Sequence, residues 1–280
     1  MDTILPSEPS NYSQIMSRSF VLYRKSFSKI ILLSVLVSVT AFFPRIMYII
    51  LGQNMFSNFA PFSPYRLFML LINLIALLFF IGIIWHMHCV IRKVREPFIE
   101  DVSVGIKKMI YALIATIIQN LLVVTSAMML FGFQVLLHQN HLLFANTFLG
   151  IVLTGIVFIG QACIVIYIAT LFIFLIPLIA VENKGIIGSL QRSALLVWNH
   201  WWRVFSVQIT PWIVYAILFF IIRNIFDINT QLHMTKSFFG MGYWSTLIHI
   251  VLFALFIPWF AALLLIQLND LELRHQLAKK

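Results

Sequence analysis

Six long apolar stretches decide which solvent this chain can fold in. They run over residues 30–51, 67–90, 109–137, 147–181, 204–226 and 244–268. A helix rises about 1.5 Å per residue and needs about 20 apolar residues to cross a bilayer. Only 10% of the residues are charged, against about 25% in a soluble domain, so polar surface is too scarce to cover a globule in water. The sequence therefore predicts an all-α polytopic membrane protein with about six transmembrane helices.

The fourth stretch, residues 147–181, is too long for one perpendicular span. Either its helix tilts, or Pro177 breaks it and leaves its last turns at the membrane interface. The first 29 residues are polar and basic, and we expect no cleavable signal sequence in them. We divide the chain into a cytoplasmic lead, residues 1–29, and a six-helix transmembrane domain, residues 30–280.

Basic residues flank the six stretches unevenly. Of the 19 Lys and Arg residues, 15 lie in the lead, after the second and fourth stretches, or after the sixth. Arg66, Arg223 and Lys236 lie on the opposite side, and Arg45 falls within the first stretch. Because cytoplasmic loops are enriched in Lys and Arg, this bias predicts both termini in the cytoplasm. The net charge of +10 then favours membrane lipids with anionic headgroups as partners, and not nucleic acid.

Two similar segments precede the first and fifth stretches and indicate an internal repeat. Residues 18–29 read RSFVLYRKSFSK, and residues 192–203 read RSALLVWNHWWR. Both predict amphipathic helices lying flat at the headgroup level, the second over about residues 186–203. A third copy around residues 102–108 would make three units, each an interfacial helix followed by a hairpin. The alternative is a simple six-helix bundle with basic linkers.

Both predicted interfacial helices have distinct faces, and we expect their basic side chains to point toward anionic lipid. The polar face of the second helix holds Ser189, Arg192, Ser193, Asn199, His200 and Arg203. Its apolar face holds Ile187, Leu190, Ala194, Val197, Trp198 and Trp201. The apolar stripe of the first helix holds Tyr12, Met16, Phe20, Tyr23 and Phe27.

Residues 177–203 carry a more specific pattern, with Pro177, Glu182, Ser193, Trp198 and Trp202 at its marked positions. It resembles the P-x4-E … A/S-L-x-x-S-x-x-L … W motif of a broad group of uncharacterised bacterial six-span membrane proteins. The group includes the YciC-like family and the membrane domain fused to some glycerophosphodiester phosphodiesterases. The resemblance implies a bacterial inner-membrane protein linked to membrane or envelope integrity. No soluble phosphodiesterase domain is present, so that activity is not implied.

The sequence offers little for catalysis or metal binding. None of the nine acids falls well inside a predicted span, so we expect neither acid–base catalysis nor a proton relay. His86 and His88 point about 200° apart on a helix, and His138 and His141 lie beside a turn with no acid or thiol nearby. We therefore predict no catalytic residue, no metal site and no cofactor.

Four polar residues inside predicted spans are candidates for contact with a substrate or headgroup: Arg45, Arg223, Gln161 and Gln208. Arg45 either snorkels to the outer headgroups or faces a cavity and holds an anionic substrate. Arg223 lies at a similar depth in the fifth stretch, and the two glutamines are expected to bond between helices.

A structural role is expected for Glu182, which ends the fourth stretch. Its carboxylate is placed either to accept bonds from the start of the next helix or to pair with Arg192. The sequence thus favours a non-catalytic membrane protein that organises lipid or partner proteins. The alternative is a small transporter or channel for an anionic or lipid-like solute, and an enzyme ranks third.

Overall fold

The computed structural model describes residues 5–6, 8–51, 64–94, 97–139, 148–182, 185–225 and 243–277. These ranges contain helices and no strands. The helices are α1 (Tyr12–Leu51), α2 (Pro64–Arg92), α3 (Phe98–Gln139), α4 (Phe148–Leu171), α5 (Leu175–Glu182), α6 (Ile186–Trp198), α7 (Trp201–Ile225) and α8 (Tyr243–Leu277).

Six stretches of these helices are long and apolar enough to cross a membrane, which confirms the all-α polytopic class. The segment before the first span is helical, as expected, but it is not a separate interfacial helix. It continues into the span as the single helix α1 of 40 residues, about 60 Å by helical rise. Only the segment before the fifth span, α6, forms a helix of its own.

The long fourth stretch is broken, as one of the two alternatives for it predicted. Residues 172–174 form a turn between α4 and α5, and the Ile173 and Leu175 N–H groups donate to Thr170 and Phe172. Pro177 is the third residue of α5, a position where the missing N–H costs nothing because the first turn of a helix has no internal acceptor. Its ring would clash with the carbonyl of residue 173 in a continuous helix, so α4 ends before it.

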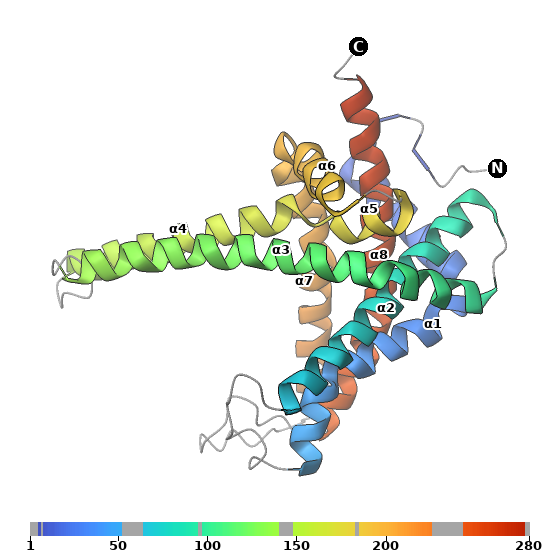
Figure 1. The fold of residues 1–280 in the computed structure, drawn as a ribbon, viewed down its shortest axis with the longest axis horizontal. Coiled ribbons are helices and arrows are strands. Elements are labelled where there is room, and N and C mark those ends of the chain that lie inside the picture. The colour runs from blue at the N-terminus through green and yellow to red at the C-terminus, as the bar shows by residue number, and fades with distance from the viewer. Residues whose placement is uncertain are drawn as a thin grey trace.

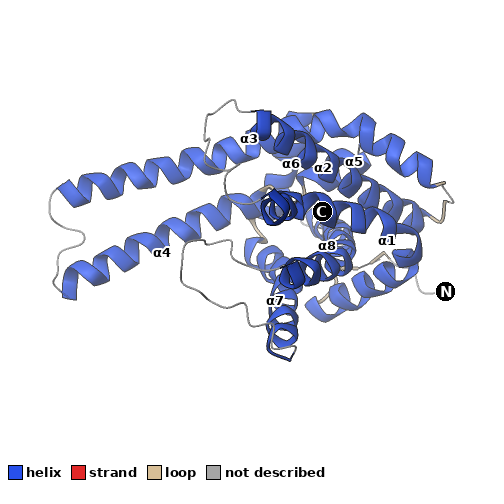
Figure 2. Ribbon diagram, turned by 90° about the horizontal axis from the view of Figure 1, so that it is seen from below, coloured by secondary structure: helices blue, strands red, loops and turns tan. Residues whose placement is uncertain are grey.

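Figures 1 and 2 show that the helices do not all run in one direction. The α3–α4 hairpin extends away from α1, α2, α7 and α8, and crosses the direction of α7 and α8. Its outer turns expose large apolar side chains, among them Leu121, Met129, Phe158 and Ile159. Such a surface needs hydrocarbon or another apolar surface around it.

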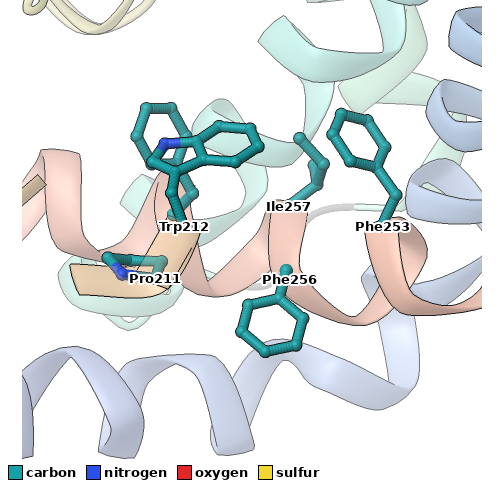
Figure 3. Close-up of a pocket in the computed structure, with 6 residues that line it drawn as sticks. Pro211, Trp212, Phe253, Phe256 and Ile257 are labelled. Carbon is teal, nitrogen blue, oxygen red and sulfur yellow. The ribbon is translucent and has the colours of Figure 1, made fainter. Parts of the chain in front are cut away.

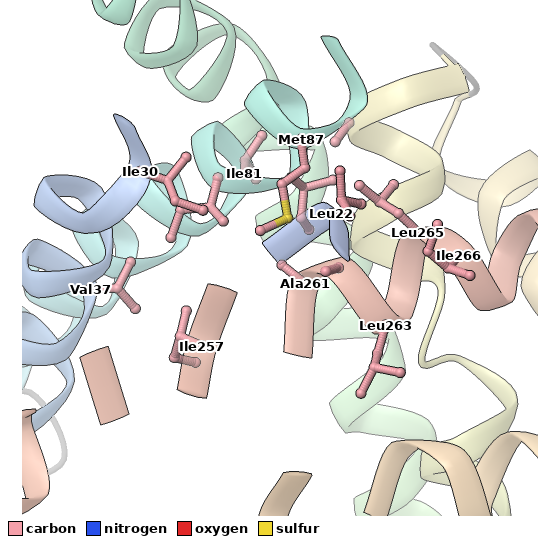
Figure 4. Packing of buried hydrophobic residues seen from close by; sticks show 14 of the residues in the cluster. Leu22, Ile30, Val37, Ile81, Met87, Ile257, Ala261, Leu263, Leu265 and Ile266 are labelled. Atoms are coloured by element: carbon pink, nitrogen blue, oxygen red, sulfur yellow. The ribbon is translucent and has the colours of Figure 1, made fainter. Parts of the chain in front are cut away.

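The main core lies where α1, α2 and α8 meet (Figure 4). Branched side chains such as Leu22, Ile81 and Leu265 fill it. Small residues bring α1 close to α8, as is common between membrane helices: the buried Ser34 hydroxyl donates to the Ala254 carbonyl of α8. A second cluster around Phe174 packs α5 and α6 onto α8.

Candidate functional site

The beginning of α1 and the end of α8 are tied together by Asp270, which is fully buried. Its carboxylate accepts hydrogen bonds from the Ser10 N–H (2.6 Å) and from the side chains of Arg274 (3.0 Å) and Arg203 (3.2 Å). Both arginines also donate to the Ser10 carbonyl, and Arg18 donates to the Ser10 hydroxyl at 2.9 Å. We call this side of the bundle the termini end, and the opposite side the far end.

A second group of charges at the termini end joins α5, α6 and α8. The Arg192 guanidinium bonds Glu272 at 2.6 Å and Glu182 at 3.1 Å. Burial acts to lower the pKa of Arg192, but the hydrogen bonds and charges of Glu272 and Glu182 outweigh burial and raise the pKa above its ordinary value. The pairing of Glu182 with Arg192 is one of the two arrangements expected for Glu182.

One expectation about charge is wrong at this end. Arg192 and Arg203 face carboxylates of the protein and not lipid, because α8 brings Glu272 and Asp270 against them. Two acids are also buried, Asp270 and Asp101, which is 2% exposed. Neither acid falls inside a predicted apolar stretch, but neighbouring helices cover both. Each is paired with a basic side chain, which is how buried charges are tolerated.

The partner of Asp101 is His86, which sequence reasoning treated as an ordinary residue of a span end. Asp101 of α3 and His86 of α2 are both buried and bond through Oδ2 and Nδ1 at 2.8 Å. His86 Nε2 and Asp101 Oδ1 have no hydrogen-bond partner. The described residues hold no group of three or more potential ligands that could bind a metal ion, and this pair is best understood as a polar tie between α2 and α3.

The faces of α6 agree with the predicted ones only in part, because Ile187 and Trp198 of the apolar face are exposed, whereas two serines of the predicted polar face are buried. Ser189 and Ser193 are buried, and the Ser193 hydroxyl donates to the Leu171 carbonyl at 2.7 Å. Serine is small enough to let α6 approach α4 and α5 closely, so its polarity is satisfied by the protein and not by water. Four large apolar side chains are instead exposed on α6 and the first turn of α7: Ile187 (68%), Leu195 (66%), Trp198 (62%) and Trp202 (71%).

The two glutamines form bonds between helices, as expected. Gln208 of α7 donates to Gln267 of α8 at 2.6 Å, and both side chains are buried. Gln161 of α4 donates to the Ala127 carbonyl of α3 at 3.4 Å. These contacts hold pairs of helices together, and neither glutamine lines the pockets described next.

Two pockets lie between helices, and both are mainly apolar. The one between α7 and α8 is lined by Pro211, Trp212, Phe253, Phe256, Ile257 and Phe260 (Figure 3). Its volume of about 10 Å³ is at the limit for one water molecule. A larger groove of about 440 Å³ lies between α2 and α3, with Asn73 and Thr116 among leucines. Arg45, Gln161 and Gln208 line neither pocket.

Arg45 lies in α1 directly after Pro44, at the far end, and its Nε is buried without a hydrogen-bond partner in the part of the chain that the structure describes. Tyr215 of α7 and His249 of α8 are near enough to interact with its charge. Arg223 belongs to α7, but its side chain lies outside the described part of the structure. The predicted pairing of Arg45 and Arg223 around one cavity therefore stays a prediction.

The fold and these contacts define a multi-pass α-helical membrane protein with a closed, internally paired termini end. No protein-family model matches the chain, and no curated protein and no solved structure is significantly similar to it. The resemblance of residues 177–203 to the YciC-like group and the internal repeat both stay predictions.

Proposed function

We propose that this protein is a non-catalytic bacterial inner-membrane protein that organises the membrane by pressing α6 and the start of α7 against the cytoplasmic leaflet. The observation that carries the proposal is the exposure of Trp198 and Trp202 beside Ile187 and Leu195. Tryptophan favours the boundary between headgroups and hydrocarbon, where its ring is buried and its N–H stays near water. Together, these four apolar side chains of α6 and the first turn of α7 form a surface anchor.

The charges around this anchor fit a lipid-organising role better than a catalytic one. Asp270, Glu182 and Glu272 are occupied by arginines, so none of these acids is free to transfer a proton. Other basic residues remain exposed, including Arg24, Lys25 and Lys29 on α1 and Lys107 on α3. Each basic residue near an anionic surface contributes about 1 kcal/mol of attraction.

Depth-dependent quenching of tryptophan fluorescence tests the proposed anchor. We compare the full chain with Trp198→Phe/Trp202→Phe in vesicles that carry a nitroxide either at the headgroup or deep in the acyl chain. The fluorescence that is lost in the double variant belongs to Trp198 and Trp202, and the headgroup nitroxide should quench it more strongly than the deep nitroxide does. The matched control is Trp259→Phe, because Trp259 lies in the core and donates to Ser19 at 3.3 Å. Equal or deeper quenching for Trp198 and Trp202 would reject the surface position.

The organising role needs a cellular readout. A deletion strain should show altered membrane lipid composition, restored by the natural chain and restored poorly by Trp198→Ser/Trp202→Ser. An unchanged lipid profile in the deletion strain would remove the basis for the role, whatever the depth of the tryptophans.

A transporter or channel for an anionic or lipid-like solute is the second candidate, and the buried, unpartnered Nε of Arg45 favours it. Passage of a solute requires a polar path, whereas Gln208 is closed off by Gln267 and the α7–α8 pocket is about 10 Å³. Uptake of a labelled anionic lipid analogue into vesicles, dependent on the protein, would favour this candidate over the first.

A further inference from the structure

Three helices direct polar groups to one place at the far end of the bundle. Arg45 comes from α1, Tyr215 from α7, and Thr246 and His249 from α8. Arg45 lies six residues from the end of α1, and His249 lies six residues from the start of α8. At about 1.5 Å per residue, both are about 9 Å from their helix ends and at the same level.

Aromatic contacts fix the imidazole of His249. Its ring stacks on Phe219 of α7, with centroids 3.9 Å apart, and on Phe42 of α1 at 5.6 Å. Phe42 is one turn before Arg45, so both side chains lie on the face of α1 that meets α8. The Tyr215 hydroxyl bonds His249 Nδ1, which leaves Nε2 as the free ring nitrogen.

Three polar atoms of this cluster are buried and have no hydrogen-bond partner among the described residues: Arg45 Nε, His249 Nε2 and Thr246 Oγ1. Thr246 itself is 3% exposed and lies one turn from His249 on the same face of α8. Unsatisfied buried polar atoms are costly and rare, so three in one place call for an explanation. A solvated surface arginine would not explain the threonine or the histidine.

All three atoms can donate a hydrogen bond, and one of them belongs to the positively charged guanidinium of Arg45. The guanidinium of Arg45 can only donate, and the hydroxyl of Thr246 can donate. His249 Nε2 carries a proton when the Tyr215 hydroxyl donates to Nδ1. Each ion pair of the described residues joins groups other than Arg45. An oxyanion is the ligand that such a set lacks.

We propose that Arg45, Thr246 and His249 bind a phosphate oxyanion at the far end of the α1–α7–α8 interface. The same chemistry is offered by the headgroup of an anionic phospholipid and by free inorganic phosphate. The depth of about 9 Å below the helix ends and the phenyl rings of Phe42 and Phe219 suit a lipid, whose chains lie along the helices. The site is independent of the tryptophan anchor at the termini end.

Native mass spectrometry of the full chain, with defined amounts of added phosphatidylglycerol, measures this binding directly. Arg45→Gln should weaken the tightest phosphatidylglycerol site at least about 10-fold, because a charged hydrogen bond is lost. Thr246→Val keeps the shape of the side chain and should weaken the site about 3- to 10-fold. If Arg45→Gln does not fold, Thr246→Val still tests the proposed site.

Two matched controls separate this site from general effects of charge and of the threonine replacement. Thr40→Val alters a threonine of α1 whose hydroxyl already donates to the Leu36 and Val37 carbonyls, and Arg92→Gln removes an exposed charge in the last turn of α2. Both should leave the tightest site unchanged. Equal phosphatidylglycerol affinity in Arg45→Gln, Thr246→Val and the natural chain would overturn a lipid site.

Thermal unfolding in phosphatidylcholine nanodiscs distinguishes a phospholipid headgroup from free inorganic phosphate as the ligand. Addition of phosphatidylglycerol should raise the thermal unfolding midpoint of the natural chain more than that of Thr246→Val. A difference produced by inorganic phosphate alone would assign the site to a free anion. If neither probe distinguishes the two chains, the cluster binds no phosphate and Arg45 only snorkels to the headgroups.

Discussion

Replacing Asp270 with Asn should remove the charge that holds three segments of the chain together at the termini end. Asp270 is fully buried, and Arg203 and Arg274 around it are each 25% exposed. Breaking a buried ion pair costs about 3–5 kcal/mol, because the partner charge stays behind. Water reaches part of both guanidinium groups, so we expect the lower end of that range, about 3 kcal/mol. For a chain of this size this amounts to about 6–12 °C in the unfolding midpoint.

Equilibrium unfolding in mixed detergent micelles measures this change. Glu100→Gln makes the same chemical replacement at an exposed acid of α3 and should stay within about 0.5 kcal/mol of the natural chain. Adding Arg274→Gln to Asp270→Asn should recover part of the loss, since one uncompensated charge is removed. A loss below about 0.5 kcal/mol for Asp270→Asn, or strict additivity in the double variant, would refute the reasoning.

Three further replacements test other contacts by the same unfolding measurement. A Cβ on Gly105 would lie 2.6 Å from the Leu78 carbonyl oxygen, so Gly105→Ala should destabilise the protein by about 1–3 kcal/mol. The control Gly160→Ala has open space around the new methyl group and should be neutral or stabilising. Equal effects of the two replacements would contradict the close approach of α2 and α3. His86→Leu and Asp101→Leu should each cost about 1–3 kcal/mol, because each leaves a buried polar group without its partner, and the double variant should cost less than the sum of the two. A strictly summed loss would argue against a tie between them. Burial, together with the charges of Arg274 and Arg203, lowers the pKa of His200. The unfolded state therefore binds more protons, and stability should fall as pH drops below about 6.5, less steeply in His200→Gln; identical pH profiles would exclude His200 as a cause.

Hydropathy was sufficient to predict the helices of this chain. Each predicted apolar stretch lies on one helix, apart from the fourth, where α4 and α5 share it. Local rules included the break near Pro177 and the pairing of Glu182 with Arg192 among their alternatives, because both depend on residues close in the sequence. The length of α1 was missed, since a hydropathy threshold ends a span where polar residues begin, although the helix itself continues.

The tertiary contacts could not be predicted in the same way. Ser10 and Asp270 are 260 residues apart, and their contact depends on how α1 and α8 pack. One local signal for Asp270 was available: the acid stands between Leu268 and Leu271, with Arg274 one turn later. The burial of two serines of α6 has a similar cause, because the small size of Ser193 matters more for helix packing than its polarity does.

The two ends of the bundle differ in how their charges are compensated, and this difference indicates where an outside ligand belongs. At the termini end, Arg192, Arg203 and Arg274 all meet carboxylates of the same chain, so the protein itself satisfies them. At the far end, Arg45 stands beside His249 and Thr246 without a described carboxylate, and each of the three retains an unsatisfied atom. A buried cation needs a counter-charge in a membrane. The counter-charge proposed for Arg45 is therefore an external oxyanion, whereas the arginines of the termini end already lie beside carboxylates.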